Sequence, residues 1–145
     1  MSTKSILLVE DNSDDADLTL RALRSSRVPG EVVVARDGEE ALDYLFDRGA
    51  LGHALPACLL LDLNLPKLDG LEVLRRLRAD RRTCLMPVVI LTASSAPQDI
   101  RAAYRLGANS YICKPVNLTL FIEAVWQVGY YWLALNEAPP LEGAL

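Results

Sequence analysis

The stretch Leu59-Leu60-Leu61-Asp62-Leu63-Asn64-Leu65-Pro66 carries most of the information about the fold. Its apolar run stops at a single carboxylate, and a turn with Asn and Pro follows. A short apolar run bounded by turn residues is typical of a strand that is buried on both faces. Asp62 would then lie at the carboxyl end of this strand, and open parallel α/β sheets bind their ligands at that edge.

Similar apolar runs occur on both sides of this stretch, and segments with helical spacing separate them. We predict strands over residues 5–9, 31–36, 57–61, 88–91 and 109–113. We predict helices that begin near residues 13, 38, 71, 97 and 118. In the helix that begins at Pro97, we expect Ile100, Ala103 and Tyr104 to face the core. Strands that alternate with helices in this way indicate a parallel sheet with helices on both faces.

The composition is that of an ordinary globular protein. Hydrophobic residues make up 51% and charged residues 23% of the 145 residues. This length suits one domain, and we assign residues 1–145 to a single domain with a C-terminal extension at about 130–145. The net charge of -4 gives no electrostatic footprint for nucleic acid. We therefore interpret the arginines within residues 75–82 as a solvated helix face, and we predict no nucleic-acid partner.

The cysteines and the single histidine do not indicate a metal or nucleophilic site. Cys58, Cys84 and Cys113 are an odd number without metal-ligand spacing, and we interpret them as small buried hydrophobes in a reducing cytoplasm. His53 lies in a Gly-Ala-Leu-Gly-His loop, so a Ser-His-Asp site or a two-histidine metal site would have to be built around this one residue. The N-terminus lacks a signal-peptide pattern, and we predict a cytoplasmic protein.

Polar residues follow four of the five predicted strands. Glu10 and Asp11 follow the first strand, Asp62 the third, Thr92 the fourth and Lys114 the fifth. Because the carboxyl ends of parallel strands lie along one edge, we expect these side chains to lie close together. Carboxylates at close range repel one another. Mg²⁺ prefers oxygen ligands and keeps several waters, so it is the counter-charge that fits this set.

A set of this kind supports phosphoryl transfer to a carboxylate. Mg²⁺ and Lys114 would neutralise charge on the transferring oxygens, and Thr92 would hydrogen-bond one of them. Asp62 is the best candidate for the nucleophile, because its strand is central and its partners arrive from either side.

Four segments resemble the receiver domains of two-component response regulators, in matching order and spacing. They are Leu-Leu-Val-Glu-Asp-Asn at 7–12, Leu-Leu-Asp-Leu-Asn-Leu-Pro-Lys-Leu-Asp-Gly at 60–70, Pro-Val-Val-Ile-Leu-Thr-Ala-Ser at 87–94 and Tyr-Ile-Cys-Lys-Pro-Val at 111–116. The resemblance covers about residues 5–135. It implies a single receiver domain without an output domain, built as a flavodoxin-like doubly wound sheet of five parallel strands in the order 2-1-3-4-5 with five helices.

The same resemblance implies a role for each residue at the strand ends. Asp62 would be the phosphoacceptor and a ligand of Mg²⁺, and Asp11 would bind Mg²⁺ directly. Glu10 would contact Mg²⁺ through water, and the backbone carbonyl of Asn64 would be a further ligand. The acidic pair is Glu-Asp in place of Asp-Asp, a common variant. The phosphate-binding and switch residues would be Thr92, Lys114 and Tyr111.

The last predicted helix, residues 118–135, carries one charged residue, Glu123, and only a narrow polar stripe. A helix that packs on one side of a sheet should show a wide polar face. The stretch is nearly of bilayer length. Because it follows the strand end at Lys114, we predict no membrane span and expect a protein partner at this face. The segment Tyr-Tyr-Trp-Leu-Ala-Leu at 130–135 with the Pro-Pro after it, the Leu-Asn-Leu-Pro-Lys run at 63–67 and the long loop around His53 resemble the small response regulators of cyanobacterial and bacterial phytochromes. This resemblance implies a homodimer through the last helix. The candidate interface residues are Trp126, Tyr130, Tyr131 and Trp132.

The expected function is therefore that of a response regulator. The resemblance implies that a histidine kinase of the phytochrome type transfers a phosphoryl group to Asp62, and that the group is lost slowly, so we expect a switch and not a turnover enzyme. One alternative is a Mg²⁺-dependent phosphatase with an aspartate nucleophile. Such enzymes of the haloacid-dehalogenase type use Asp-x-Asp, and here Asn64 holds the second position. The other alternative is a receiver-like interaction module that does not use phosphate, against which the complete set of site residues argues.

Overall fold

The computed structural model describes residues 4–25, 29–48 and 55–140. Its strands form one sheet in the order β2-β1-β3-β4-β5, and every neighbouring pair is parallel. This confirms the fold and the strand order that the sequence predicts. The strands are β1 Ser5–Val9, β2 Glu31–Ala35, β3 Cys58–Leu61, β4 Val88–Thr92 and β5 Ser110–Cys113.

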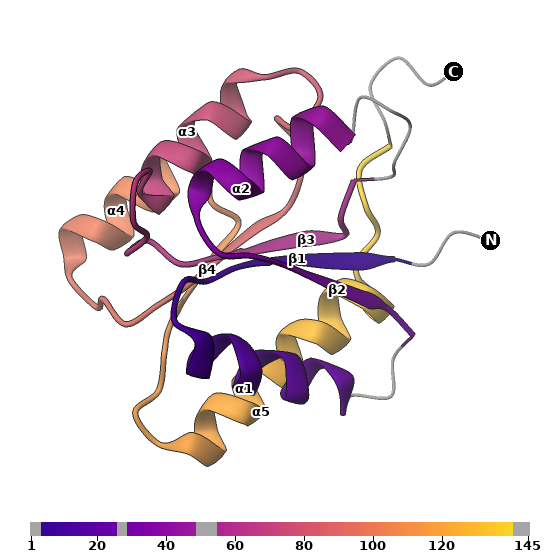
Figure 1. Ribbon diagram of the computed structural model, residues 1–145, viewed down its shortest axis with the longest axis vertical. Coiled ribbons are helices and arrows are strands. Elements are labelled where there is room, and N and C mark those ends of the chain that lie inside the picture. The colour runs from indigo at the N-terminus through magenta and orange to yellow at the C-terminus, as the bar shows by residue number, and fades with distance from the viewer. Residues whose placement is uncertain (1–3, 26–28, 49–54, 141–145) are drawn as a thin grey trace.

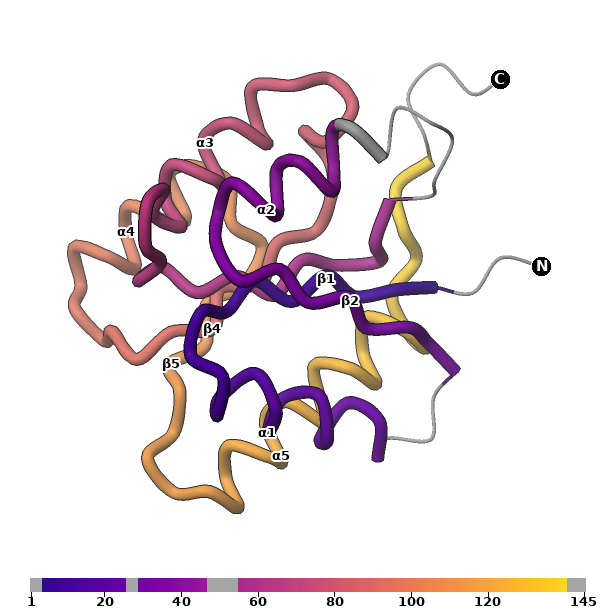
Figure 2. The backbone as a smooth tube through the Cα atoms, in the orientation of Figure 1, coloured from indigo at the N-terminus to yellow at the C-terminus, as the bar shows by residue number. Residues whose placement is uncertain are grey.

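Helices cover both faces of this sheet. Figure 1 shows α1 and α5 on one face and α2, α3 and α4 on the other. The helices are α1 Ser13–Arg24, α2 Gly38–Asp43, α3 Gly70–Ala79, α4 Pro97–Arg105 and α5 Leu118–Tyr130. One π-helical turn, η1 Tyr44–Arg48, continues α2, and another, η3 Tyr131–Leu135, continues α5. Figure 2 shows that the chain leaves β1 and β5 at the same edge of the sheet before it turns into α1 and α5.

Two hydrophobic cores lie on the two faces of the sheet, and the central strand β3 supplies both. Leu59 and Leu61 belong to the core under α2, α3 and α4. Cys58 and Leu60 belong to the core under α1 and α5. All four residues are buried, which is the pattern of a strand covered on both faces. The carboxyl end of β3 is therefore held rigidly, and Asp62 follows it directly.

Side-chain caps begin most of these helices, in the segments that follow the strands. Asn12 accepts a hydrogen bond from the backbone N–H of Asp15 at the start of α1. Asp37, Asp69 and Asn117 cap α2, α3 and α5 in the same way, whereas α4 begins at Pro97 without a side-chain cap. A cap satisfies a backbone donor that the helix cannot pair internally. The first turn of each capped helix is thereby fixed next to the strand edge.

Arg78 differs from the expectation that the arginines of this helix form a solvated face. Its guanidinium is half-buried and donates to the backbone carbonyls of Gly107 at 2.8 Å and Met86 at 2.7 Å. It also donates to the side-chain oxygen of Asn109 at 2.9 Å. A planar group with five donors can join loops from two parts of the chain. Arg78 therefore ties the chain before β4 to the chain before β5.

Two further expectations about burial are wrong. Tyr104 is exposed, because it lies about 100° around α4 from the fully buried Ala103. Of the cysteines, only Cys58 is buried, and burial raises its pKa. Cys113 is exposed because it ends the edge strand β5, and Cys84 is partly exposed. The loop position expected for His53 lies outside the described residues.

Candidate functional site

Three carboxylates meet at the carboxyl edge of the sheet. Glu10 and Asp11 follow β1, and Asp62 follows the adjacent strand β3. One oxygen of each lies within 4.8 Å of the others. Glu10 is 2% exposed and Asp62 is 6% exposed, whereas Asp11 is open to solvent. Two of the three carboxylates are therefore removed from water, and each needs partners of its own.

The two oxygens of Asp62 have different partners. Its Oδ1 accepts hydrogen bonds from the hydroxyl of Thr92 at 2.9 Å and from the backbone N–H of Asn64 at 3.0 Å. Its Oδ2 accepts from the ammonium of Lys114 at 2.9 Å. The carboxylate is held in one orientation by a hydroxyl, an amide and an ammonium from three separate segments.

The loop after Asp62 requires a glycine where it returns to the sheet. A Cβ on Gly70 would lie 2.3 Å from the backbone oxygen of Asp62, so no other residue fits there without a shift. The N–H of Gly70 donates to the carbonyl of Leu63 at 3.0 Å. Lys67, within this loop, adopts a left-handed conformation with φ of 64°. This tight return explains why the sequence ends the segment with Asp69-Gly70.

The ammonium of Lys114 lies among three carboxylates. It donates to Oε1 of Glu10 at 2.5 Å and to Oδ2 of Asp62 at 2.9 Å. It also donates to Oδ2 of Asp15 at 2.9 Å. The backbone N–H of Lys114 donates to the carbonyl of Thr92 at 2.7 Å, which extends the pairing of β5 with β4. The sequence predicts Lys114 in the site but not its contact with Asp15.

Burial and neighbouring charges shift the pKa values of Glu10 and Lys114. Burial, with the negative charge of Asp62 in support, raises the pKa of Glu10 to about 7, although the contact with Lys114 acts in the opposite direction. Burial disfavours the charged form of Lys114, but hydrogen bonds to three carboxylates outweigh it and raise the pKa of this ammonium. Lys114 is therefore firmly cationic and partly neutralises the acidic cluster.

Tyr111 does not contact Asp62 but joins β5 to the loop after Thr92. Its hydroxyl donates to the backbone carbonyl of Ser94 at 2.9 Å, and its ring packs partly buried against the core. Burial raises the pKa of this hydroxyl. The hydroxyl of Ser94 donates to the Asp99 carboxylate at 2.5 Å. Asp62 thus accepts from Thr92, and two residues further along the chain Ser94 accepts from Tyr111.

Asp15 and Ser94 belong to the surroundings of the site, although the sequence alone does not predict either of them there. In the sequence, Asp15 is one of two adjacent acidic residues that suit the positive end of a helix N-terminus. Its position in the first turn of the helix that follows Glu10 and Asp11 is the available signal. Ser94 contributes its backbone carbonyl to Tyr111, and no pattern of side chains predicts such a contact.

The residues present fit a divalent cation. The oxygens that Glu10, Asp11 and Asp62 offer lie within 4.8 Å of one another. Asp15 adds a fourth carboxylate, which contacts Lys114. Lys114 brings one positive charge against these four. Hard oxygen donors with an excess of negative charge are what Mg²⁺ requires. Asn64 follows Asp62 closely in the loop, and the ligand role of its backbone carbonyl stays a prediction.

The aromatic residues near the end of the chain lie on two sides of the last helix. Trp126, Tyr130 and Tyr131 are 39%, 40% and 46% exposed. The rings of Trp126 and Tyr130 stack at 5.6 Å between centroids. Trp132 packs instead against the core under α1 and α5. The outward candidates for an interface are therefore Trp126, Tyr130 and Tyr131.

The segment Leu118–Leu135 is long and apolar enough to cross a membrane by length and composition alone. In the fold it packs against α1, and Phe121, Val125 and Val128 contribute to the core between them. Only 28% of this segment is buried, so its other side remains exposed.

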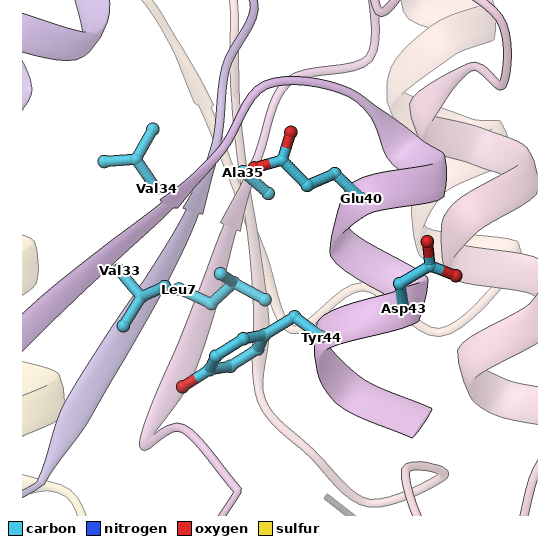
Figure 3. Close-up of a pocket in the computed structure, with 7 residues that line it drawn as sticks. All are labelled: Leu7, Val33, Val34, Ala35, Glu40, Asp43 and Tyr44. Carbon is cyan, nitrogen blue, oxygen red and sulfur yellow. The ribbon is translucent and has the colours of Figure 1, made fainter. Parts of the chain in front are cut away.

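A separate hollow of about 390 Å³ lies between α2 and the edge of the sheet. Figure 3 shows its walls, which come from β1, β2 and the region of α2. The lining residues are Leu7, Val33, Val34, Ala35, Glu40, Asp43 and Tyr44. None of the residues that surround Asp62 is among them, so this hollow is not part of the acidic site.

Comparison with known proteins gives consistent matches. The model of the response regulator receiver domain matches residues 6–126. A probable methanogenesis regulatory protein, FilR2 of Methanothrix harundinacea, is 42% identical over 134 residues, which cover 92% of this chain and 86% of that protein. The response regulator Rcp1 of Synechocystis is 38% identical over 137 residues, which cover 94% of this chain and 93% of that protein.

Solved structures agree with these sequence matches. The phosphorylated cyanobacterial phytochrome response regulator RcpA superimposes with a TM-score of 0.88 at 42% identity, covering 96% of this chain and all of that chain. The Mn²⁺-bound form of Rcp1 superimposes with a TM-score of 0.87 at 37% identity, covering 94% of this chain and 99% of that chain.

Proposed function

The chain belongs to the response regulator receiver family, and we propose that it accepts a phosphoryl group from a partner histidine kinase on the carboxylate of Asp62. The observation that carries this proposal is the environment of Asp62. It is a buried carboxylate at the end of the central strand, with its two oxygens oriented by Thr92, Asn64 and Lys114. The solved relative RcpA is a phosphorylated protein, which supports the same reaction here.

The chemistry follows from these contacts. An oxygen of Asp62 forms a bond to phosphorus as the bond between phosphorus and the nitrogen of the donor histidine breaks, and the imidazole leaves with that electron pair. Lys114 supplies positive charge beside the oxygens of the transferring group, and Thr92 supplies a hydroxyl donor. Asn64 has an amide where an aspartate phosphatase has its acid/base carboxylate, so we expect a switch and not a turnover enzyme.

Mg²⁺ is the cofactor that we assign to the acidic cluster. Asp11, Asp62 and the backbone carbonyl of Asn64 would hold it, and Glu10 would contact it through water. A bound Mg²⁺ neutralises negative charge on the transferring oxygens. Support comes from the cluster itself and from the relative Rcp1, which has a Mn²⁺-bound form.

We assign the kinase to the phytochrome class. The relative RcpA is a phytochrome response regulator, and its structure covers nearly this whole chain. Because a histidine kinase takes its phosphoryl group from ATP, we place the transfer in the cytoplasm. The output would be a protein interaction, and we expect neither a nucleic-acid partner nor insertion into a membrane.

Phosphorylation would change the face formed by α4, β5 and α5. A phosphoryl group adds about 1.5 to 2 negative charges and three acceptor oxygens. We infer that it draws the Thr92 hydroxyl from its present bond to Asp62, so that the loop at Ser94 moves and Tyr111 loses its acceptor there. The exposed side of α5, with Trp126 and Tyr130, would form a homodimer contact on this face.

The direct test is phosphorylation of Asp62→Asn beside wild type. Incubation with a phytochrome-type kinase and labelled ATP should label wild type and leave Asp62→Asn unlabelled, because an amide cannot form the acyl phosphate. Asp69→Asn is the matched control, since Asn is also a good helix cap and Asp69 lies only seven residues along the chain. Equal labelling of Asp62→Asn would place the acceptor elsewhere.

A further inference from the structure

Asp15 is a fourth carboxylate at the site, and its backbone is fixed at two points. Its N–H donates to the side-chain oxygen of Asn12 at 2.9 Å. Its carbonyl accepts from the hydroxyl of Thr19 at 2.7 Å, and Thr19 is buried. The first turn of α1 therefore presents this carboxylate to the site from a rigid support.

The side chain of Asp15 uses one of the three donors of an ammonium. Lys114 donates to Glu10, Asp15 and Asp62, so all three of its N–H groups are engaged. The side chains of Glu10 and Asp62 are 3% and 7% exposed, whereas that of Asp15 is 34% exposed. Asp15 is thus the partner of Lys114 on the solvent side of the cluster.

A phosphoryl group on Asp62 would need a donor from the same ammonium. Its new oxygens carry negative charge and lie on the carboxylate to which Lys114 already donates. Since no N–H of Lys114 is free, the first contact to a phosphoryl oxygen takes the N–H that now serves Asp62, and a second contact must replace or weaken the bond to Glu10 or to Asp15. Glu10 is deeply buried and accepts otherwise from the Asn12 N–H at 3.2 Å, whereas the side chain of Asp15 is 34% exposed, so Asp15 is the partner that water can most readily solvate.

We propose that Asp15 is a positioning residue that holds the Lys114 ammonium in the resting site and thereby competes with an incoming phosphoryl group for it. This inference rests on the proposed function, because it concerns the same transfer to Asp62. It assigns to the first turn of α1 a role in setting how readily the protein becomes phosphorylated.

The test uses acetyl phosphate as the donor and beryllofluoride as a stable mimic of the phosphoryl group, both with Mg²⁺. In the transfer, an Asp62 oxygen bonds to phosphorus, the bond between phosphorus and the acetyl oxygen breaks, and acetate leaves. Asp15→Asn should lower the KM for acetyl phosphate and the Kd for beryllofluoride about two- to fivefold, the range expected for one half-exposed ion pair.

Two variants separate this role from general charge and from helix stability. Asp14→Asn makes the same change of charge in the same turn, at an exposed residue that is not among the three partners of the Lys114 ammonium. It should leave KM and Kd near the wild-type values. Asp15→Glu keeps a carboxylate and should behave like wild type. The NMR resonance of the Lys114 side-chain ammonium should shift in Asp15→Asn and not in Asp14→Asn.

The outcomes are distinct. Tighter beryllofluoride binding in Asp15→Asn alone, with the shifted Lys114 resonance, supports competition for the ammonium. Equal values in Asp15→Asn and Asp14→Asn, weaker binding in Asp15→Asn, or an unmoved Lys114 resonance overturns it. If wild type acquires no phosphoryl group on Asp62, the proposed function fails; if wild type is labelled and Asp15→Asn matches Asp14→Asn, only this inference fails.

Discussion

The carboxylate of Asp62 divides its two oxygens between different parts of the protein. Oδ1 faces Thr92 and the Asn64 amide, and Oδ2 faces Lys114. A charged group in a buried place is tolerated only when it is paired and hydrogen-bonded, and these partners satisfy that condition. At the scale of single residues, the site is therefore complete before any phosphoryl group arrives.

The hydroxyl of Thr92 is the first residue-scale test. Thr92→Ala should still be phosphorylated on Asp62, because the Asn64 amide and Lys114 remain. In this variant, phosphorylation should no longer change the environment of Tyr111, because the hydroxyl that the phosphoryl group would draw is missing. Loss of the buried hydrogen bond between Thr92 and Asp62 would lower the unfolding free energy by about 1 kcal/mol.

Labelling of Asp62 together with NMR of the Tyr111 ring, before and after phosphorylation, measures both effects. Thr92→Ser keeps the hydroxyl and is the control. A Tyr111 response of equal size in wild type and Thr92→Ala would remove Thr92 from the switch.

Asp11 provides the second residue-scale test, which concerns the metal. Asp11→Asn should weaken Mg²⁺ binding about tenfold or more, since loss even of an outer-shell partner often costs that much. Without Mg²⁺ the variant should be as stable as wild type or more stable, because one of the repelling carboxylates is neutral. Thermal unfolding with and without Mg²⁺ measures both quantities, since a bound ligand raises stability. A Mg²⁺-induced shift as large as in wild type would exclude Asp11 as a ligand; Asp14→Asn is the matched control.

At the scale of elements, the helix starts do more than begin helices. Each side-chain cap lies close after a strand end or the loop that follows it, and it fixes the orientation of the first helical turn. In α1 this places Asp15 against Lys114. In α3 the cap at Asp69 precedes the glycine that approaches the backbone of Asp62. Local capping chemistry thus contributes to the geometry of the acidic site.

The cap at Asp37 gives an element-scale prediction with a pH dependence. The hydrogen bond from the Glu40 N–H, with Lys67 in support, lowers the pKa of Asp37 below its ordinary value of 3.8. The stability from its charge is therefore complete above pH 3.8 and is lost as the pH falls through the lower pKa of the folded state. Asp37→Ala should lose about 1 kcal/mol of unfolding free energy at pH 7.

Urea unfolding at pH 7 and at pH 3 tests this cap. Asp37→Asn keeps a cap oxygen and should lose less at pH 7, while its stability should depend less on pH than that of wild type. Asp43→Ala, at the last residue of α2, should change the stability by less than about 0.5 kcal/mol. Equal losses in Asp37→Ala and Asp43→Ala would show that the cap contributes little.

At the scale of the whole molecule, the exposed side of α5 is more apolar than a solvated helix requires. Leu118, Leu120, Ile122, Trp126 and Tyr130 are all exposed along it. A stable interface of standard size buries roughly 1,600 Å² in total, and aromatic anchors are frequent hot spots. A two-fold dimer would place the same patch of each subunit against its partner.

We expect a dimer at micromolar concentration even without phosphate. Trp126→Glu and Tyr130→Glu should dissociate it, because each places a charge in an apolar contact. Leu85→Glu introduces the same charge at an exposed apolar residue between α3 and β4, away from α5, and is the matched control. Sedimentation velocity measures the assembly. A wild-type monomer at tens of micromolar, with and without phosphorylation, would leave this face for another partner such as the kinase.

Most of the fold and the main site residues could be predicted from the sequence. Continuous apolar runs indicate the strands, because these strands are buried on both faces. Apolar residues at helical spacing indicate the helices, because each helix is buried on one side. The carboxyl ends of parallel strands share one edge, so Glu10, Asp62 and Lys114 could be expected to meet before their distances were known. The strand order and the individual roles came from the family resemblance, since periodicity alone does not order strands in a sheet.

Residue type and periodicity along the chain are enough to predict the alternation of elements, the residues at the strand ends and the apolar character of α5. Packing between segments distant in the chain decides that Asp15 reaches Lys114, that Arg78 is half-buried, and that Trp132 packs inward while Trp126 faces out. The hydrophobic pattern of a segment predicts which of its positions are buried, but not which other segments they contact. The rotation of that element, and the partner that a long side chain reaches, are set by packing against segments distant in the chain.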